Sequence, residues 1–252
     1  MINTIGNVDC LGELGMPMIA DGSVDGIISD PPYNISMKSN FHTMGRAGVD
    51  FGDWDKGFDL TAWLGVALDK LKNGGNIVIF NDWKNLGYIK DFLEERGCLI
   101  KEMIIWKKPA PMPRNRDRLY VTTCEYALWA TKGKHWTFNR SRDNYENAIF
   151  EYPTVSSKQR NHPTQKPVKL MEDIINIHSN PGDIILDPFM GSGTTAVACV
   201  NTNRNYIGFE LDKGYYDIAV ARVEAASNMV ATISAKALLC PSMSANVKEE
   251  QQ

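Results

Sequence analysis

The chain has 252 residues, of which 43 % are hydrophobic and 23 % are charged, and its formal net charge is −3. This is ordinary globular composition, and the length suits one large α/β domain or one domain with a small insertion. There is no run of eighteen apolar residues, and no basic amino-terminal region precedes an apolar stretch. We therefore expect neither a membrane span nor a secretory signal.

The five cysteines are scattered, and none is spaced as Cys-x-x-Cys from another. An odd, unpaired set of this kind predicts reduced thiols in a cytoplasm rather than a disulfide framework or a zinc site. None of the four histidines lies at ligand spacing from another histidine or from paired cysteines. No metal site is expected.

The net charge hides an asymmetry along the chain. Residues 101–169 contain 14 Lys and Arg against 6 Asp and Glu, whereas the rest of the chain is acidic. A basic middle on an acidic chain is the footprint expected of a protein that binds a polyanion. The alternative is a solvated surface without a partner.

Short, continuous apolar runs predict buried strands, in chain order, at residues 2–8, 24–29, 76–80, 99–106, 125–130, 183–186 and 205–209. Helical patterns between them cover residues 60–71, 88–96, 168–178, 196–201 and 215–227. Alternating strands and helices predict an α/β fold, a doubly wound and mostly parallel seven-stranded sheet. No helix separates strand 99–106 from strand 125–130, so these two are expected to form an antiparallel hairpin at one edge.

Three segments fall outside this alternation. Residues 34–58 are rich in Gly, Asn, Ser and Met, and residues 131–161 are basic and polar with interspersed aromatics. Loops this long in a compact domain are usually functional or disordered. Both are therefore candidates for recognising a target. Residues 228–252 lose periodicity and are expected to form a loose tail, which leaves residues 1–227 as the domain.

The peptide Asp30-Pro31-Pro32-Tyr33 follows the predicted strand 24–29, and open α/β sheets bind ligands at the carboxyl ends of their strands. The amino nitrogen of adenine or cytosine is a poor nucleophile because its lone pair is delocalised into the ring. The Asp30 carboxylate and the carbonyl beside Pro31 can accept its two hydrogens, and the prolines keep the peptide stiff. Tyr33 offers a ring on which an extruded base can stack. All four are candidate catalytic residues; the alternative is a strand-ending turn.

A second peptide, residues 187–195, also lies between a predicted strand and a predicted helix. Its two glycines permit backbone angles and close approach that a Cβ would forbid. Ser192, Thr194 and Thr195 are expected to cap the helix and to leave free N–H groups at its positive end, which suits the carboxylate of a methionine-like group. Asp187 can bind the ammonium of that group. The candidate cofactor-binding residues here are Asp187, Phe189, Gly191, Ser192, Gly193 and Thr194. No Gly-Lys-Ser/Thr follows, which disfavours a nucleotide P-loop.

Two more acidic residues end predicted strands. Glu210 follows strand 205–209, where an α/β cofactor fold holds ribose hydroxyls. Asp9 follows strand 2–8 and can accept a hydrogen bond from the adenine amino group of a cofactor. The alternatives are a surface carboxylate and a turn aspartate.

With these motifs, the chain resembles the amino-methyltransferases that act on adenine N6 and cytosine N4 of DNA. It resembles the β class, in which the catalytic motif precedes the cofactor motif. Similar features cover residues 1 to 225 and include residues 71–83, 106–109, 124–130 and the peptide His162-Pro163-Thr164-Gln165-Lys166-Pro167. The resemblance implies a Rossmann-like methyltransferase domain that uses S-adenosylmethionine. It also implies cofactor contacts from Thr164 and Lys166.

The same resemblance implies a double-stranded DNA partner, with single-stranded DNA as an option. It further offers a homodimer and a companion restriction endonuclease as options, alongside the cytoplasmic location and the lack of a membrane or metal expected from the residues above. The segment that recognises the target is long in many relatives but short here at residues 131–161. Recognition is therefore expected to be brief, relaxed or shared with residues 34–58. Arg114, Arg116 and Arg118 are candidates to bind phosphate or guanine edges.

Asp at the first motif position leans to adenine in this family and Ser leans to cytosine, so the expected reaction is methylation of adenine N6. Cytosine N4 is the main alternative. RNA and a protein glutamine amide are others, although relatives acting on glutamine tend to carry Asn-Pro-Pro-Tyr. A DNA-binding module without activity is disfavoured by the two intact motifs.

Overall fold

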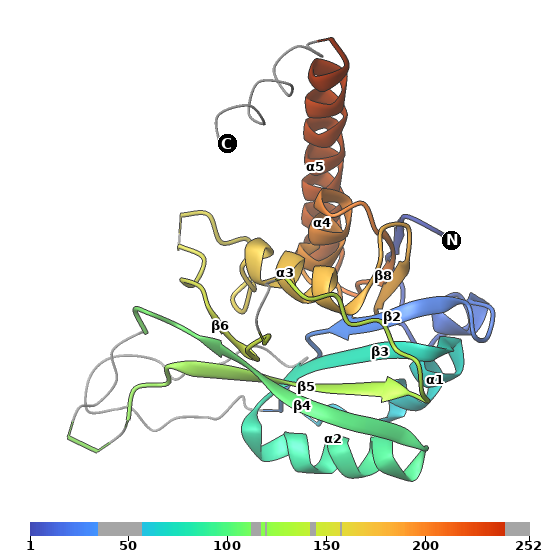
Figure 1. The fold of residues 1–252 in the computed structure, drawn as a ribbon, viewed down its shortest axis with the longest axis vertical. Helices are drawn as coiled ribbons and strands as arrows, with labels where there is room; N and C mark the ends of the chain where they lie inside the picture. Colours follow the sequence, from blue (N-terminus) through green and yellow to red (C-terminus); the bar gives the residue numbers. More distant parts are fainter. Residues whose placement is uncertain (35–56, 112–116, 119, 142–144, 157, 240–252) are drawn as a thin grey trace, which may run out of the picture.

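The computed structural model describes residues 1–34, 57–111, 117–118, 120–141, 145–156 and 158–239. Its centre is one eight-stranded sheet in the order β1-β8-β7-β2-β3-β5-β4-β6 (Figure 1). β5 runs antiparallel to its neighbours β3 and β4, and all the other neighbouring strands are parallel. The strands are β1 (Thr4–Gly6), β2 (Val24–Ser29), β3 (Leu71–Asn81), β4 (Cys98–Lys107), β5 (Cys124–Lys132), β6 (Ile149–Glu151), β7 (Ile184–Asp187) and β8 (Asn205–Phe209).

Helices cover both faces of the sheet (Figure 1). They are α1 (Ala62–Lys70), α2 (Trp83–Glu95), α3 (Val168–His178), α4 (Thr194–Asn201) and α5 (Lys213–Leu239), with a short 3₁₀ turn η1 at Met16–Met18. α1 and α2 pack on one face, and α3, α4 and the start of α5 pack on the other. The two hydrophobic cores follow from strand geometry, because successive side chains alternate between faces. Ile27 of β2 lies in the first core and Ile28 in the second.

The topology gathers the motifs at one end of the sheet. β8, β7, β2 and β3 are adjacent and mutually parallel, so their carboxyl ends meet. Asp30 directly follows β2, Asp187 is the last residue of β7, and Glu210 directly follows β8. We call this side the carboxyl end of the sheet. An open α/β sheet binds ligands here, outside the ends of its strands.

The sheet differs from the prediction in one strand. β6 lies inside the segment 131–161 and pairs in parallel with β4, so the sheet has eight strands rather than seven. The antiparallel β4–β5 hairpin is present, but β6 lies outside it and forms the edge of the sheet. Three residues are too few to show an apolar period, which is why β6 could not be recognised from sequence.

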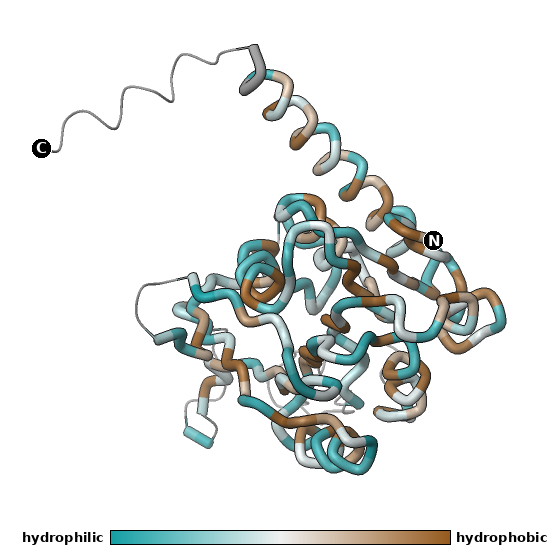
Figure 2. Tube along the Cα trace, turned by 45° about the vertical axis from the view of Figure 1, so that its right-hand side comes forward, coloured by the Kyte–Doolittle hydropathy of each residue, from teal (hydrophilic) through white to brown (hydrophobic). Residues whose placement is uncertain are grey.

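The carboxyl-terminal helix also differs. α5 continues to Leu239, which corrects the prediction of a loose tail for residues 228–239; residues 240–252 lie outside the described part of the chain. Ala219 and Val223 pack it against the body, whereas Met229 and Ile233 are exposed. Figures 1 and 2 show this later part of α5 standing away from the sheet. A helix exposed on most sides has no apolar stripe, so periodicity did not reveal it.

None of the helices in the described ranges has both the length and the hydropathy that crossing a membrane requires. In the same ranges, no three His, Cys, Asp or Glu side chains gather as the ligands of a metal ion would.

Candidate active site

The Asp30 carboxylate lies at the carboxyl end of β2, and both of its oxygens have protein partners. The Tyr33 hydroxyl donates to Oδ1 at 2.5 Å, and the Lys166 ammonium donates to Oδ2 at 2.5 Å. Lys166 Nζ also lies 3.2 Å from the Tyr33 hydroxyl. The structure therefore joins the catalytic motif to Lys166, which the resemblance assigned to cofactor contact.

A chain of alternating charges continues from this point. Lys166 is 4 % exposed and pairs with Glu125 at 3.1 Å as well as with Asp30, and Glu125 pairs with Lys108 at 2.6 Å. Burial alone would lower the pKa of Lys166, but the carboxylates of Asp30 and Glu125 outweigh it and raise that pKa. Burial alone would raise the pKa of Glu125, but Lys166 and Lys108 hold it below its usual range. Lys166 and Glu125 therefore both keep their charges near neutral pH.

The backbone of the catalytic motif is fixed by the start of α2. The Asn85 side chain donates to the Tyr33 carbonyl at 2.7 Å and to Asn81 Oδ1 at the same distance. Burial, followed by the nearby Asp30 charge, raises the pKa of the Tyr33 hydroxyl well above its usual value. The Tyr33 hydroxyl therefore keeps its proton near neutral pH and can donate a hydrogen bond.

Asp187 is buried at the end of β7, 2 % exposed, and both of its carboxylate oxygens accept hydrogen bonds. Ser29 donates to Oδ1 at 2.7 Å, Thr195 donates to Oδ2 at 2.6 Å, and the Phe189 N–H donates to Oδ1 at 3.1 Å. Burial raises the pKa of Asp187 to about 6, although all three hydrogen bonds favour the ionised form. Its bond to Ser29 links the last residue of β2 directly to the glycine motif.

The turn after β7 uses its two glycines differently. Gly191 has φ +52° and its N–H donates to Glu210 Oε2 at 2.7 Å; the nearest atom to a Cβ there would be His162 Cδ2, at 3.9 Å. Gly193 has φ +82°, and a Cβ there would lie 2.9 Å from the Cα of Ala219 on α5. A Cβ at Gly191 would thus make only an ordinary contact with His162, whereas Gly193 permits two helices to pack closely.

The hydroxyl side chains of the turn do not cap α4 as the sequence suggested. Gly193 is the N-cap and makes no side-chain capping bond. Ser192 Oγ and the Ser192 carbonyl both contact the guanidinium of Arg222, and Thr194 Oγ1 lies 3.4 Å from it. Thr195 is used by Asp187 instead. The amino end of α4 therefore has no side-chain capping bond.

Aromatic and imidazole rings border the turn on two sides. Phe189 meets Phe58 and Trp63 edge to face, with centroids 5.3 and 5.2 Å apart. His162 meets Tyr215 at 4.3 Å. Burial lowers the pKa of His162, which keeps the ring neutral near pH 7.

Three further cofactor candidates, Thr164, Glu210 and Asp9, each form hydrogen bonds with residues close to them in the structure. Thr164 lies in the same peptide as His162, with its hydroxyl 3.1 Å from His162 Nδ1. Glu210 accepts the Asp212 N–H as well as that of Gly191, and burial raises its pKa. Asp9 is exposed after β1 and accepts the Leu11 N–H at 2.9 Å.

The segment 131–161 crosses from one end of the sheet to the other. Its first part lies at the opposite end, where Thr137 accepts from Asn76, Phe138 stacks on Trp129, and Lys101 lies over the Trp136 ring. These two aromatics therefore pack onto the body. The segment returns through β6, whose last residue lies beside the last residue of β4.

The arginine candidates lie in the connection between β4 and β5, which leaves from the carboxyl end of the sheet (Figure 1). Arg118 is exposed there. Arg114 and Arg116 fall outside the described residues, as does most of the loop 34–58.

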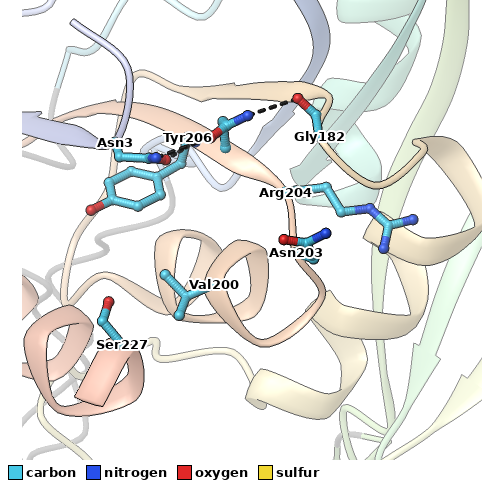
Figure 3. Close-up of a pocket in the computed structure, with 8 residues that line it drawn as sticks. Asn3, Gly182, Val200, Asn203, Arg204, Tyr206 and Ser227 are labelled. Atoms are coloured by element: carbon cyan, nitrogen blue, oxygen red, sulfur yellow. Dashed lines mark hydrogen bonds between the residues drawn. The ribbon is translucent and has the colours of Figure 1, made fainter. Parts of the chain in front are cut away.

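A shallow polar cavity of about 250 Å³ lies elsewhere (Figure 3). It is lined by Gly182, Arg204 and Asn205, at the start of β7 and β8, together with Asn3 and Tyr206. Arg204 is held there by Ser179 and Asn176. This cavity is at the end of the strands opposite to Asp30 and plays no part in the site.

Several residues at the site carried no sequence signal of their own. Tertiary structure brings Glu125, Asn85, His162 and Arg222 to the motifs from distant positions, and it brings Ser29, which directly precedes Asp30, to Asp187. His162 and Glu125 stand within peptides that resemble family motifs. For the other three, only the three-dimensional fold reveals the contact.

A profile of the N6/N4 DNA methylase family matches residues 24–221. The type II methyltransferase M2.MboI of Moraxella bovis is 32 % identical over 226 residues, covering 82 % of this chain and 83 % of the relative. M2.DpnII of Streptococcus pneumoniae is 32 % identical over 223 residues, with 81 % and 83 % covered. The crystal structure of the M1.HpyAVI–SAM complex is 38 % identical, covers 87 % of this chain and 98 % of its own, and has a TM-score of 0.71.

The fold and the site define a methyltransferase with a Rossmann-like sheet that uses S-adenosylmethionine. More particularly, the chain belongs to the N6/N4 DNA methylase family, and it is a DNA methyltransferase. The residues present fit the cofactor: among the described residues a Cβ at Gly191 would meet only His162 within 4 Å, the amino end of α4 lacks a side-chain cap, and Asp187 and Glu210 lie at the carboxyl ends of the adjoining strands β7 and β8. The cytosine-N4-specific PvuII methyltransferase shares the fold, with a TM-score of 0.66 at 18 % identity.

Proposed function

We propose that this enzyme methylates the N6 amino group of adenine in double-stranded DNA. The observation that carries the proposal is the Asp30 carboxylate, held at the carboxyl end of β2 beside the cofactor motif of β7. A carboxylate at this position is a stronger acceptor than a hydroxyl for an amino group that gains positive charge. Asp rather than Ser at residue 30 favours adenine over cytosine.

In the proposed mechanism, Asp30 and the carbonyl beside Pro31 accept the two hydrogens of the amino group and orient its lone pair. Tyr33 stacks the extruded base. S-adenosylmethionine, when bound, supplies a methyl group on a positively charged sulfur. Asp30 would hold the amino group through the transfer and would accept the proton that the nitrogen loses once it is methylated. Positioning and electrostatics supply most of the rate enhancement.

For the cofactor, we propose that Asp187 faces the ammonium and the amino end of α4 faces the carboxylate, with Gly191 and its neighbours forming the turn. Glu210 is assigned to the ribose hydroxyls and Asp9 to the adenine amino group. Phe189 and Thr164 border this space. A bound ammonium would favour the ionised form of Asp187, which burial disfavours.

The relatives also indicate a biological setting. We propose a cytoplasmic enzyme that works beside a companion restriction endonuclease and forms a homodimer. Type II methyltransferases among its relatives support the link to restriction. Arg114, Arg116 and Arg118 are assigned to DNA, and single-stranded DNA is a second candidate substrate.

The test is long-read sequencing of DNA from a methylation-free host that expresses the chain. We expect N6-methyladenine at one recognition sequence. Asp30→Ala should bind cofactor and DNA but transfer methyl groups at least ~10²-fold more slowly, as expected for a group acting on the transition state. Asp91→Ala is a matched control, since the Asp91 side chain is 70 % exposed on α2. N4-methylcytosine, or unmodified DNA, would overturn the adenine assignment.

A further inference from the structure

Lys166 is a buried ammonium group surrounded by acceptors. Its Nζ lies within 3.2 Å of Asp30 Oδ2, Glu125 Oε2 and the Tyr33 hydroxyl. It also lies 5.1 Å from the centroid of the Phe80 ring. A lysine buried among such close partners loses its hydration and its rotamer freedom. The carboxylates around it therefore fix its side-chain conformation.

The carboxylates that hold Lys166 come from separate elements. Asp30 follows β2, Glu125 belongs to β5, and Lys108, which follows β4, pairs with Glu125 from the other side. Two positive and two negative side chains therefore alternate, and their charges balance. Asp30 is the member of this set at the candidate active site, and its side chain is 21 % exposed.

The free energy of folding alone does not explain why four charged side chains alternate here. Buried ion pairs are often no more stabilising than apolar residues of the same volume, and their clearest use is to fix a single geometry. An Asp side chain at a strand end can otherwise rotate about χ1 and χ2. The contact with Lys166 removes that freedom at the carboxylate that must meet the target amino group.

We propose that Lys166 is a positioning residue for methyl transfer, which fixes the direction of the Asp30 carboxylate while Glu125 shares its positive charge. The inference rests on the function proposed above. Sharing matters because a lysine paired with Asp30 alone would bind that carboxylate more tightly and weaken it as an acceptor. Glu125 thus keeps Asp30 both oriented and available.

The test compares four variants of the full chain: Lys166→Met, Glu125→Gln, the double variant, and Lys169→Met as a control. Lys169 lies three residues further on, is 61 % exposed, and among the described residues pairs with Glu172 and Asp173 at the surface of α3. For each variant, thermal unfolding, S-adenosylmethionine affinity by calorimetry, KM for DNA and the single-turnover rate are measured.

We expect Lys166→Met to slow the single-turnover step on the order of 10²-fold, as a misplaced catalytic group does. Cofactor affinity and KM for DNA should stay close to wild type. Glu125→Gln should slow the step about tenfold, equivalent to about 1.4 kcal/mol at the transition state. The double variant should regain thermal stability over Lys166→Met, because its remaining charges balance, but should not regain rate. Lys169→Met should behave as wild type.

Three results would overturn the proposal. Cofactor affinity that falls in step with the rate would make Lys166 a cofactor ligand. If the double variant regains the wild-type rate, Lys166 and Glu125 only compensate each other's charge and do not position Asp30. A wild-type single-turnover rate in Glu125→Gln would show that Glu125 does not need to share the charge of Lys166. This variant still tests the proposal if Lys166→Met does not fold. A wild-type protein that fails to methylate adenine would instead defeat the proposed function.

Discussion

The Tyr33 hydroxyl donates a hydrogen bond to Oδ1 of Asp30, at 2.5 Å. The residue proposed to stack the base is thus also a partner of the carboxylate proposed to accept the amino hydrogen. A target amino group that binds Oδ1 competes with this hydroxyl. The two parts of Tyr33 can therefore be tested separately. Its ring favours base binding, and its hydroxyl occupies Asp30 Oδ1, which the amino group needs as an acceptor.

Tyr33→Phe removes the competing hydroxyl and keeps the ring. We expect its single-turnover rate to stay within about threefold of wild type, whereas Tyr33→Ala should weaken capture of the base by ~1–3 kcal/mol, the usual worth of one stacked base. Base extrusion can be followed by the fluorescence of 2-aminopurine at the target position. If Tyr33→Phe is as slow as Tyr33→Ala, the hydroxyl itself is needed for transfer.

Gly191→Ala tests the space beside the glycine turn. Its φ of +52° and that of Gly22, +60°, are similar, and nothing lies within 4 Å of a Cβ at Gly22. Each substitution should therefore cost about 1–2 kcal/mol of stability from backbone strain. Only Gly191→Ala should also weaken S-adenosylmethionine binding, by about tenfold or more if the methyl group crowds the cofactor.

Calorimetry and chemical denaturation of the two variants separate these effects. Equal cofactor affinity in Gly191→Ala and Gly22→Ala would show that the cofactor does not approach this turn. Gly193 is a poor choice for the test, because a Cβ there would meet the backbone of Ala219 and disturb the packing of α4 on α5.

Asp187 should make stability depend on pH. Its pKa is raised from 3.8 to about 6 by burial, so between these values the folded protein binds more protons than the unfolded chain. Stability contributed by the protonated form is therefore present at low pH and falls as pH rises from about 4 to about 6. Asp187→Asn should flatten this part of the curve in urea unfolding measured from pH 4 to pH 8.

The same carboxylate should make cofactor affinity depend on pH in the opposite direction. If ionised Asp187 faces the ammonium of S-adenosylmethionine, affinity should weaken as pH falls through about 6. Asp187→Asn should bind weakly and without this dependence. A wild-type affinity that is constant from pH 5 to pH 8 would place the ammonium elsewhere.

The basic connection between β4 and β5 should determine the salt dependence of DNA binding. Replacing Arg114, Arg116 and Arg118 by Ala should weaken affinity and lower the slope of log K against log salt by about one for every phosphate that the variant no longer binds. A contact to a base edge should instead relax the methylated sequence at one position. Unchanged affinity and slope in a salt series would move recognition to the loop 34–58.

Patterns that repeat over several residues allowed much of the fold to be predicted. The bounds of β2, β8 and α3 agree with the expected ranges, because each is a buried apolar run or an amphipathic stripe with clear end signals. β6 is too short to repeat, and the end of α5 buries too little to show a stripe. Both depend on contacts or exposure that local sequence does not encode.

The site divides in the same way. Asp30 and Asp187 could be placed because parallel strand ends meet, and the structure links their strands through Ser29. The position of Lys166 beside Asp30 could not be predicted from the sequence, because 136 residues separate the two and no periodic pattern relates them. The roles of Ser192 and Thr194 were assigned from helix-capping propensity, but Arg222 competes for their hydroxyls.

The strand order also has a consequence for synthesis of the protein. β1 and β2 precede β7 and β8 in the chain, yet β8 and β7 lie between them in the sheet. A nascent chain with residues 1–180 can form β2, β3, β5 and β4, but one side of β2 then lacks its neighbour. Such an open strand edge invites pairing with other chains. We expect folding to depend on protection of this edge until β7 inserts, and the capacity to modify DNA to arise only after β7 and β8 have joined the sheet.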